Sequence, residues 1–172
     1  MDDPNDLTRS RTYTWSDPMS AAQAGRSLSG LEYMQKLLAG EFPPPPIAAT
    51  MGFRLAEVEF GRAVFEIVPA EYHYNPIGIV HGGLAATLLD SALGCAIHTT
   101  LPAGTGYSTL ELHVNLVRGI TAQTGLLHCE GKGIHAGRQV ATAEARLVDA
   151  QGKLYAHGTT TCIIFSPGKS SQ

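Results

Sequence analysis

The 172-residue sequence predicts one α+β domain in which a long central helix is wrapped by an antiparallel sheet of about six strands. The first observation is a long and almost entirely apolar helical segment at residues 82–101. The second is the alternation of apolar and polar residues on both sides of it. A helix with hardly any polar face has to be covered on nearly all sides, and strands are what the sequence offers as cover. The length suits a single domain.

Six segments show the strand pattern. Residues 53–60 and 62–69 alternate apolar with polar side chains and meet at Gly61, which predicts a hairpin. Four further candidates follow the helix, at residues 108–120, 125–135, 139–150 and 154–165. Their connections are short and rich in turn residues, so we expect these four strands to form an antiparallel meander.

The N-terminal part of the chain is less regular. Residues 1–26 are polar and predict a flexible tail, so that the domain proper spans 27–167 and residues 168–172 form a second tail. Apolar residues at helical spacing predict a short helix within 27–38. The four prolines at 43–46 end that helix and predict a stiff, extended connector, because proline lacks an amide donor and disfavours helix before it.

Composition excludes several classes of protein. The chain is 44% hydrophobic and 16% charged with a net charge of −3, which predicts no nucleic-acid partner. The three cysteines (Cys95, Cys129 and Cys162) lack zinc-type spacing, and so do the histidines, so we expect neither a disulfide framework nor a metal. The N-terminus lacks a secretion signal, which predicts a cytoplasmic protein. The apolar stretch at 77–97 contains a carboxylate, which argues against a membrane span.

That carboxylate, Asp90, is the only charged residue between Glu71 and Glu111. An uncompensated charge in an apolar helix is costly unless the protein pairs it or uses it. A purely structural interpretation has Asp90 hydrogen-bonded to the hydroxyl of Ser91 or Thr87. The functional interpretation makes it part of a site, because perturbed ionisable groups cluster at functional sites.

The motif His81-Gly82-Gly83 lies where a loop becomes the central helix. Amides in the first turn of a helix have no intrahelical carbonyl to bind, and the helix dipole favours negative charge there. This predicts a site for a developing oxyanion. Gly82 and Asp90 are eight residues apart, or about 12 Å along a helix. They cannot act on one reacting atom within a single chain, but they could do so across a two-fold axis.

Two other groups are candidates for chemistry. His81 is either a general base or a residue that orients its loop. Cys95 and His98 lie three residues apart on the helix, which suits a cysteine nucleophile beside a histidine base. The alternative is that Cys95 is inert packing, because an apolar setting raises the pKa of a thiol.

Asn75, the His81-Gly82-Gly83 motif, Asp90 within LLDSALG and the segment LELHVNLVRG together resemble the hotdog-fold acyl-CoA thioesterases of the PaaI-like branch. The resemblance covers residues 43–165. It implies the hotdog fold, an acyl-CoA substrate and no cofactor, since coenzyme A is part of the substrate. It also implies homodimers, often paired into dimers of dimers, with active sites at the subunit interface.

The same resemblance implies catalytic roles for five residues. Asp90 would be the general base or the nucleophile. The amide of Gly82 would polarise the thioester carbonyl. Asn75 would position the thioester or the attacking water, His81 would fix the loop, and Ser108 would assist Asp90.

Coenzyme A carries phosphates, so its site needs cations near the pocket mouth. Arg118 at a strand end and Arg138 in the turn HAGRQ are the candidates, with Lys132 behind them. Gly83, next to the amide of Gly82, is a further candidate for contact with the substrate.

The sequence therefore predicts a hydrolase that releases coenzyme A from a small aryl- or medium-chain acyl-CoA. Two rivals keep the fold. A hotdog dehydratase or hydratase would rely on a histidine opposite the carboxylate, and an acyl-CoA sensor would bind without chemistry. The acyl group is not determined by the sequence. Leu88 or Leu89, Phe53 and Tyr74 are candidates for lining its pocket.

Overall fold

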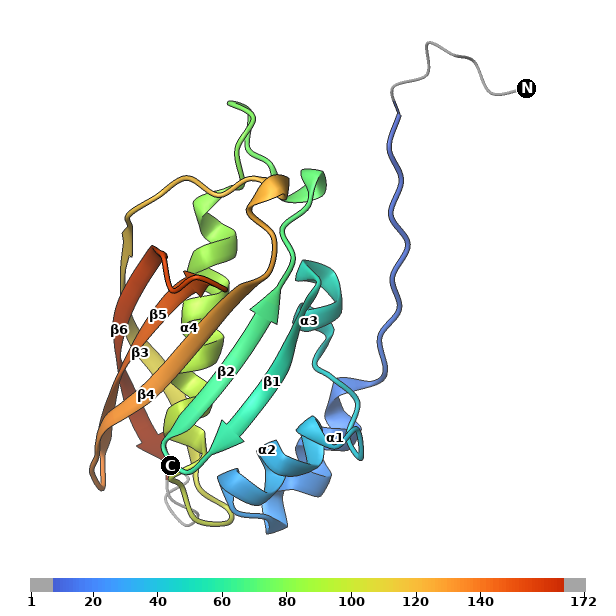
Figure 1. The fold of residues 1–172 in the computed structure, drawn as a ribbon. Coiled ribbons are helices and arrows are strands. Elements are labelled where there is room, and N and C mark those ends of the chain that lie inside the picture. The colour runs from blue at the N-terminus through green and yellow to red at the C-terminus, as the bar shows by residue number, and fades with distance from the viewer. Residues whose placement is uncertain (1–7, 166–172) are drawn as a thin grey trace.

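The computed structural model describes residues 8–165 and contains a six-stranded antiparallel sheet (Figure 1). The strands lie side by side in the order β1-β2-β4-β5-β6-β3. The strands are β1 (Phe53–Glu59), β2 (Arg62–Ile67), β3 (Gly106–Leu116), β4 (Leu127–Ala136), β5 (Val140–Asp149) and β6 (Leu154–Phe165). The α-helices are α1 (Pro18–Ala24), α2 (Gly30–Leu38), α3 (Pro46–Met51) and α4 (Gly82–His98). Three short 3-10 turns are η1 (Gly25–Ser27), η2 (Glu71–His73) and η3 (Ala122–Thr124).

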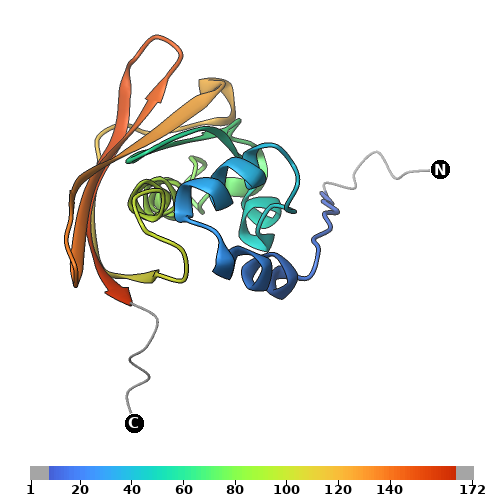
Figure 2. The ribbon, with the colours of Figure 1, turned by 90° about the horizontal axis from the view of Figure 1, so that it is seen from below.

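The sheet curls around α4, as the view from below shows (Figure 2). Nine residues of α4 are buried, so the prediction of a central helix covered on most sides is confirmed. Two glycines allow close approach of other backbone. A Cβ at Gly131 of β4 would lie 2.2 Å from the carbonyl oxygen of Ala92 in α4, and one at Gly158 of β6 would lie 2.5 Å from the carbonyl oxygen of His113 in the neighbouring strand β3. The architecture is the hotdog fold.

The predicted four-strand meander is wrong at its first connection. Strands β4, β5 and β6 do form a meander, but β3 pairs with β6 at the edge of the sheet and not with β4. The reason is the length of the connection. β3 ends at Leu116 and β4 begins at Leu127, so the ten intervening residues can cross from the edge strand to the interior of the sheet. The alternating pattern of residues 108–120 predicts a longer β3 and a short turn after it.

The N-terminal region contains two helices that the sequence did not predict. α1 forms within the segment expected to be a flexible tail, and its first amides are capped by Asp17, whose carboxylate accepts from Met19 N at 2.9 Å. α3 begins at the last of the four prolines, Pro46, because proline is well suited to the first position of a helix. The predicted helix within 27–38 is confirmed as α2, which opens with a capping box between Ser29 and Glu32.

These N-terminal helices occupy the open side of the curled sheet, next to β1 and α4 (Figures 1 and 2). Leu37 of α2 and Ile47 of α3 line one cavity together with Phe53 of β1 and Tyr107 of β3. Helices α2 and α3, which belong to the predicted domain, therefore contribute to the interior that faces α4.

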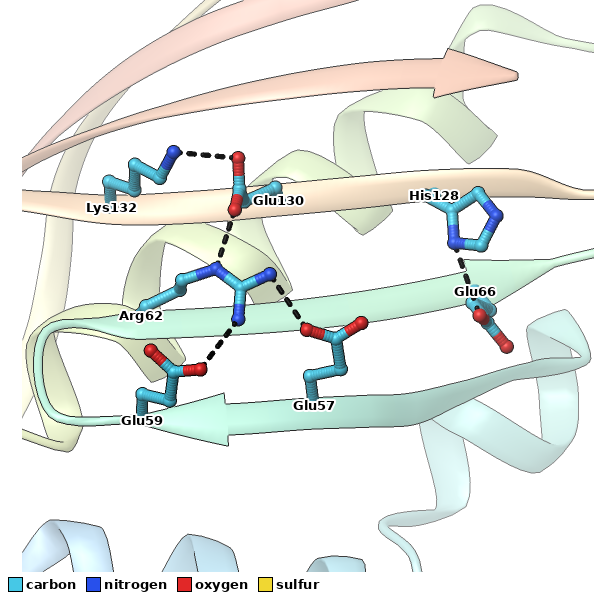
Figure 3. Close-up of polar contacts among 7 residues, drawn as sticks. All are labelled: Glu57, Glu59, Arg62, Glu66, His128, Glu130 and Lys132. Carbon is cyan, nitrogen blue, oxygen red and sulfur yellow. Dashed lines mark hydrogen bonds and ion pairs between the residues drawn. The ribbon is translucent and has the colours of Figure 1, made fainter. Parts of the chain in front are cut away.

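The opposite, solvent-facing side of β1, β2 and β4 carries a network of ion pairs (Figure 3). The guanidinium of Arg62 contacts the carboxylates of Glu57 at 2.7 Å, Glu59 at 3.3 Å and Glu130 at 2.5 Å. Lys132 completes it, with Nζ 2.9 Å from Glu130. The network ties three neighbouring strands together from outside the core.

Candidate active site

The start of α4 is held by His81, which is its N-cap residue. The Nδ1 atom of His81 accepts a hydrogen bond from the amide of Gly83 at 2.8 Å. Because Nδ1 acts as an acceptor, the ring proton of the neutral imidazole lies on Nε2. The amide of Gly83 is therefore already used. The amide of Gly82, at the first helical position, has no intrahelical acceptor and is available to a ligand.

Asn75 organises the loop that leads into α4. Its side-chain oxygen accepts from the amides of Ile77 at 3.1 Å and Ile79 at 3.2 Å, and its own amide donates to the carbonyl of Ile79 at 2.7 Å. Gly78 takes a left-handed conformation, with φ of 81°, that closes this turn. The side-chain nitrogen of Asn75 remains as the part that can donate to a ligand.

A cavity of about 290 Å³ lies at this end of the molecule. Asn75, His81, Gly82 and Arg118 all line it, so the structure brings together four of the residues singled out in the sequence. A Cβ at position 82 would lie 2.5 Å from Cδ1 of Leu116. Leu116 of β3 therefore packs against the start of α4, and its side chain, which is 58% exposed, would have to shift to make room for a methyl group there. Asp90 is absent from the lining of this cavity.

Asp90 lines a different cavity, of about 220 Å³, near the middle of α4. The walls of this second cavity are mainly apolar, and they are formed by Leu37, Pro45, Ile47, Phe53, Phe65, Ser91, Gly94, Cys95, Tyr107 and Thr109. Thr109 Oγ1 donates to Asp90 Oδ1 at 3.1 Å. Ser91 and Thr87 instead donate to helix carbonyls one turn back, at 2.8 and 2.9 Å. Asp90 therefore does accept a hydrogen bond from a hydroxyl, but its partner is Thr109 and not Ser91 or Thr87.

The hydroxyl that meets Asp90 belongs to Thr109 and not to Ser108. Ser108 is exposed and pairs with Ile163 of β6, on a strand whose side chains alternate between the two faces. Tyr107 and Thr109 take the face toward α4. A register shift between Thr109 and Glu111 follows directly. The sequence pattern did not identify Thr109, because strand phase next to a bulge depends on the pairing partner.

The basic residues predicted to bind coenzyme A also lie in different parts of the molecule. Arg118 lines the cavity of Gly82, where its Nη1 donates to the carbonyl of Leu154 at 2.6 Å. Arg138 is exposed in the turn between β4 and β5. That turn is at the far end of the sheet, because the opposite end of β4, at Leu127, pairs with Ile67 of β2, which leads into the α4 loop. Lys132 belongs to the ion-pair network on the outer face.

Cys95 and His98 do not form a catalytic pair. Burial raises the pKa of the Cys95 thiol to about 12, and the nearby carboxylate of Asp90 adds to this shift. The His98 ring lies between Tyr33 and Tyr107, at centroid distances of 5.6 and 5.5 Å, and burial lowers its pKa. A thiol with such a pKa is protonated at neutral pH, so Cys95 is packing and not a nucleophile.

The expected pocket residues divide between cavities. Phe53 lines the cavity of Asp90. Tyr74 lines another cavity, of about 560 Å³, whose walls also include His81 and the predicted substrate-contacting residue Gly83. Leu88 and Leu89 are fully buried in the core. Between residues 8 and 165, no group of histidine, cysteine and acidic side chains is arranged to hold a metal ion, and no helix is long and apolar enough to span a membrane.

Residues 77–156 match the profile of the thioesterase superfamily, a range that includes Gly82, Asp90, Thr109, Arg118 and Arg138. A protein of Saccharolobus solfataricus named as an esterase is 33% identical over 101 residues, which is 59% of this chain and 70% of the relative. The chain belongs to the thioesterase superfamily. A 1,4-dihydroxy-2-naphthoyl-CoA hydrolase of Listeria monocytogenes is 27% identical over 61% of this chain and 84% of its own length.

Among solved structures, a phenylacetic acid degradation-related protein from Ralstonia eutropha JMP134, described as a thioesterase, superposes with a TM-score of 0.69 and 32% identity. The superposition covers 76% of this chain and 98% of the Ralstonia chain. The thioesterase described here is therefore longer than that neighbour. The fold, the profile and the relatives agree that the enzyme is an acyl-CoA thioester hydrolase of the PaaI-like type.

Proposed function

We propose that the enzyme hydrolyses a small aryl- or medium-chain acyl-CoA at a site that two subunits of a homodimer build together. The observation that carries this proposal is the separation of the two catalytic groups. The amide of Gly82 faces one cavity and the carboxylate of Asp90 faces another. A thioester needs an oxyanion donor and an activated nucleophile at the same carbon. A second copy of the chain can supply the missing half to each cavity.

The edge strand β3 provides a route to this dimer. We call the Gly82 amide with its cavity and the Asp90 carboxylate with its cavity the two half-sites. Strand β3 contacts both, since Thr109 donates to Asp90 and Leu116 packs against Gly82. Leu110 and Leu116 are 60% and 58% exposed along it, and one edge of the strand has no neighbour in the sheet. Antiparallel pairing of two β3 strands about a two-fold axis would place the Leu116 end of one beside the Thr109 end of the other. Gly82 of one subunit would then approach Asp90 of its partner.

The proposed reaction starts with the thioester carbonyl oxygen at the Gly82 amide. In one route the carboxylate of Asp90 takes a proton from water, and the water oxygen bonds to the carbonyl carbon. The carbon–sulfur bond then breaks, and coenzyme A leaves as a thiolate that takes up a proton. In the other route a carboxylate oxygen of Asp90 attacks the carbon directly, forming an anhydride that water hydrolyses. The hydrogen bond from Thr109 occupies one oxygen of Asp90 and leaves the other for either role.

The two routes differ in where an oxygen atom from solvent appears. A single turnover in ¹⁸O-labelled water places the label in the released acid by the general-base route. In the anhydride route, water that attacks the Asp90 carbonyl labels the protein, and mass spectrometry of the peptide containing Asp90 detects it. Water that attacks the acyl carbonyl of the anhydride labels only the acid, so trapping of the acyl-enzyme with hydroxylamine completes the comparison.

The cation that supports binding of coenzyme A within the Gly82 cavity is Arg118. Arg138 lies at the other end of its own subunit, so we propose that it reaches the site of the neighbouring subunit. Further pairing of dimers into a tetramer would leave this arrangement unchanged, and sedimentation equilibrium measures both steps of assembly.

Active-site complementation tests the shared site. Asp90→Asn removes the carboxylate, and Gly82→Pro removes the amide donor at a helix position that proline tolerates. His81 already has the extended backbone, with φ of −62° and ψ of 134°, that a following proline requires. Each variant alone should release almost no coenzyme A. Mixed and allowed to exchange subunits, they should regain up to about a quarter of the wild-type activity, because half of the dimers are mixed and each holds one intact site.

The control is a mixture of each variant with itself after the same treatment. A mixture of the two variants that exchanges subunits but stays inactive would show that the site lies within one chain. Wild-type protein that binds acyl-CoA without releasing coenzyme A would favour the sensor. Hydration of an enoyl-CoA in place of thioester cleavage would favour the hydratase.

A further inference from the structure

A cavity of about 780 Å³ lies directly beyond the cavity of Asp90. It is formed by the N-terminal segment, the end of α4 and the start of β3, and its lining is Ala22, Gly25, Arg26, Leu28, Tyr33, His98, Gly104, Thr105, Gly106 and Tyr107. Its size is within the range of small-molecule pockets, which is roughly 300–1,000 Å³. The cavity of Asp90, at about 220 Å³, falls below that range.

Tyr107 lines both cavities and is the side chain between them. Two elements lead from the reacting centre to it in the same direction. Along α4, Asp90 is followed one turn later by Gly94 and then by His98. Along β3, Thr109 is preceded on the same face by Tyr107. The order of groups is therefore the carboxylate, then the tyrosine ring, then the larger cavity.

The Tyr107 side chain is held in place by its neighbours. A Cβ at position 94 would lie 2.9 Å from the Tyr107 hydroxyl, so Gly94 makes the space into which that hydroxyl packs. The ring contacts His98 at a centroid distance of 5.5 Å, and His98 in turn contacts Tyr33 at 5.6 Å. Such a row of packed rings resists rotation of any one member.

We infer that Tyr107 is the end wall of the acyl pocket and determines which acyl groups the enzyme accepts. This rests on the proposed function, because it takes Asp90 to be at the thioester carbon. With the ring in place, the acyl group has only the small cavity bounded by Leu37, Ile47, Phe53 and Phe65. That space suits a short chain or one aromatic ring. Longer aryl-alkyl groups would need the room behind Tyr107.

A homologous series of thioesters tests this inference. Benzoyl-CoA and phenylacetyl-CoA are compared with phenylalkanoyl-CoA thioesters of increasing linker length, and kcat/KM is measured for each. The wild type should lose activity steeply once the ring passes the limit set by Tyr107. Tyr107→Ala should raise kcat/KM for the longest members relative to phenylacetyl-CoA by at least about tenfold, since a single methylene in an apolar pocket is already worth about that much.

Two further variants make the test specific. Tyr107→Phe keeps the ring and should keep the length limit. Ala22→Trp refills the larger cavity from an exposed position on α1. Alone it should leave the substrate profile of the wild type unchanged. Combined with Tyr107→Ala it should cancel the gain on long substrates.

The outcomes separate this inference from the proposed function. A wild type that cleaves long and short members equally well, or a Tyr107→Ala profile that matches the wild type, would overturn the inference while leaving hydrolysis intact. If Tyr107→Ala fails to fold, loss of activity on short substrates in Ala22→Trp alone would overturn it. Absence of cleavage across the whole series would overturn the proposed function and the inference with it.

Discussion

The two half-sites on α4 differ in the kind of group that would take part in the reaction. At the start of the helix the reactive group is a backbone amide, that of Gly82, and the surrounding residues shape a loop: Asn75 closes its turn and His81 caps the helix. In the middle of the helix the reactive group is the side chain of Asp90. It stands in an apolar cavity with a hydroxyl from another strand beside it.

The two half-sites differ in which substitutions remove their reactive group. A backbone amide cannot be mutated away except by proline, but it depends on the local loop. A carboxylate can be removed by one substitution, and its environment is assembled from α2, α3, β1, β2 and β3. The start of α4 is therefore a local structure, whereas its middle is a tertiary one.

Removal of the Asp90 carboxylate should have the largest effect. In Asp90→Asn, which keeps size and shape, we expect the rate of coenzyme A release to fall on the order of 1,000-fold, because general-base or nucleophilic catalysis is lost. A continuous thiol-detection assay measures it. Circular dichroism and sedimentation should show an unchanged fold and assembly. Activity within tenfold of the wild type would contradict the role of Asp90.

Loss of the Gly82 amide donor should come second. Gly82→Pro should lower kcat on the order of 100-fold, as expected for one oxyanion donor. Gly82→Ala is the matched control, because it keeps the N–H and adds only the methyl group that presses on Leu116. We expect alanine to cost distinctly less than proline. Equal losses in the two variants would indicate that packing against β3, and not the amide, matters at this position.

The hydroxyl beside Asp90 should have a smaller effect. Thr109→Val is nearly isosteric and removes the hydrogen bond to Oδ1 of Asp90. We expect a fall of about tenfold in kcat, the equivalent of one hydrogen bond to a charged group. Ser108→Ala, one residue earlier on the exposed face, should change kcat by less than about twofold. The opposite ranking would restore Ser108 as the assisting residue.

The smallest effect concerns stability on the outer face of the sheet. Burial alone would raise the pKa of Glu130, but hydrogen bonds from Arg62 and Lys132 outweigh it and lower the pKa below its usual value. Because the pKa of Glu130 is lower in the folded than in the unfolded protein, its ionised carboxylate stabilises the fold at pH values above the unfolded-state pKa. That stabilisation is lost as the pH falls through the folded-state pKa. Arg62→Met should therefore cost about 1 kcal/mol near pH 7.

The difference in free energy of unfolding between Arg62→Met and the wild type should shrink as the pH falls below about 4.3, the pKa of glutamate in model peptides. Urea unfolding at several pH values measures it. Thioester hydrolysis at neutral pH should stay near the wild-type level, because the network lies on the face away from α4 (Figure 3). A pH-independent difference would assign the loss to packing of the Arg62 stem.

The sequence by itself determined what depends on neighbouring residues along the chain. The central helix, the strand segments and the start of α4 after His81 follow from periodicity and from the two glycines, since those features act within a few residues. The separation of Gly82 from Asp90 also followed, because helix rise is constant. Helix α3 is not predicted, because a run of prolines favours an extended connector, although its last proline suits a helix start.

The tertiary structure alone decided what depends on pairing between distant segments. It placed β3 beside β6 and so left β3 at an edge. It brought Thr109, and not Ser108, to Asp90, because strand phase is set by the partner strand. It put Arg118 and Arg138 at opposite ends of one subunit and placed Tyr107 between two cavities. None of these contacts is encoded by spacing along the chain, since each joins segments whose relative position only the folded sheet defines.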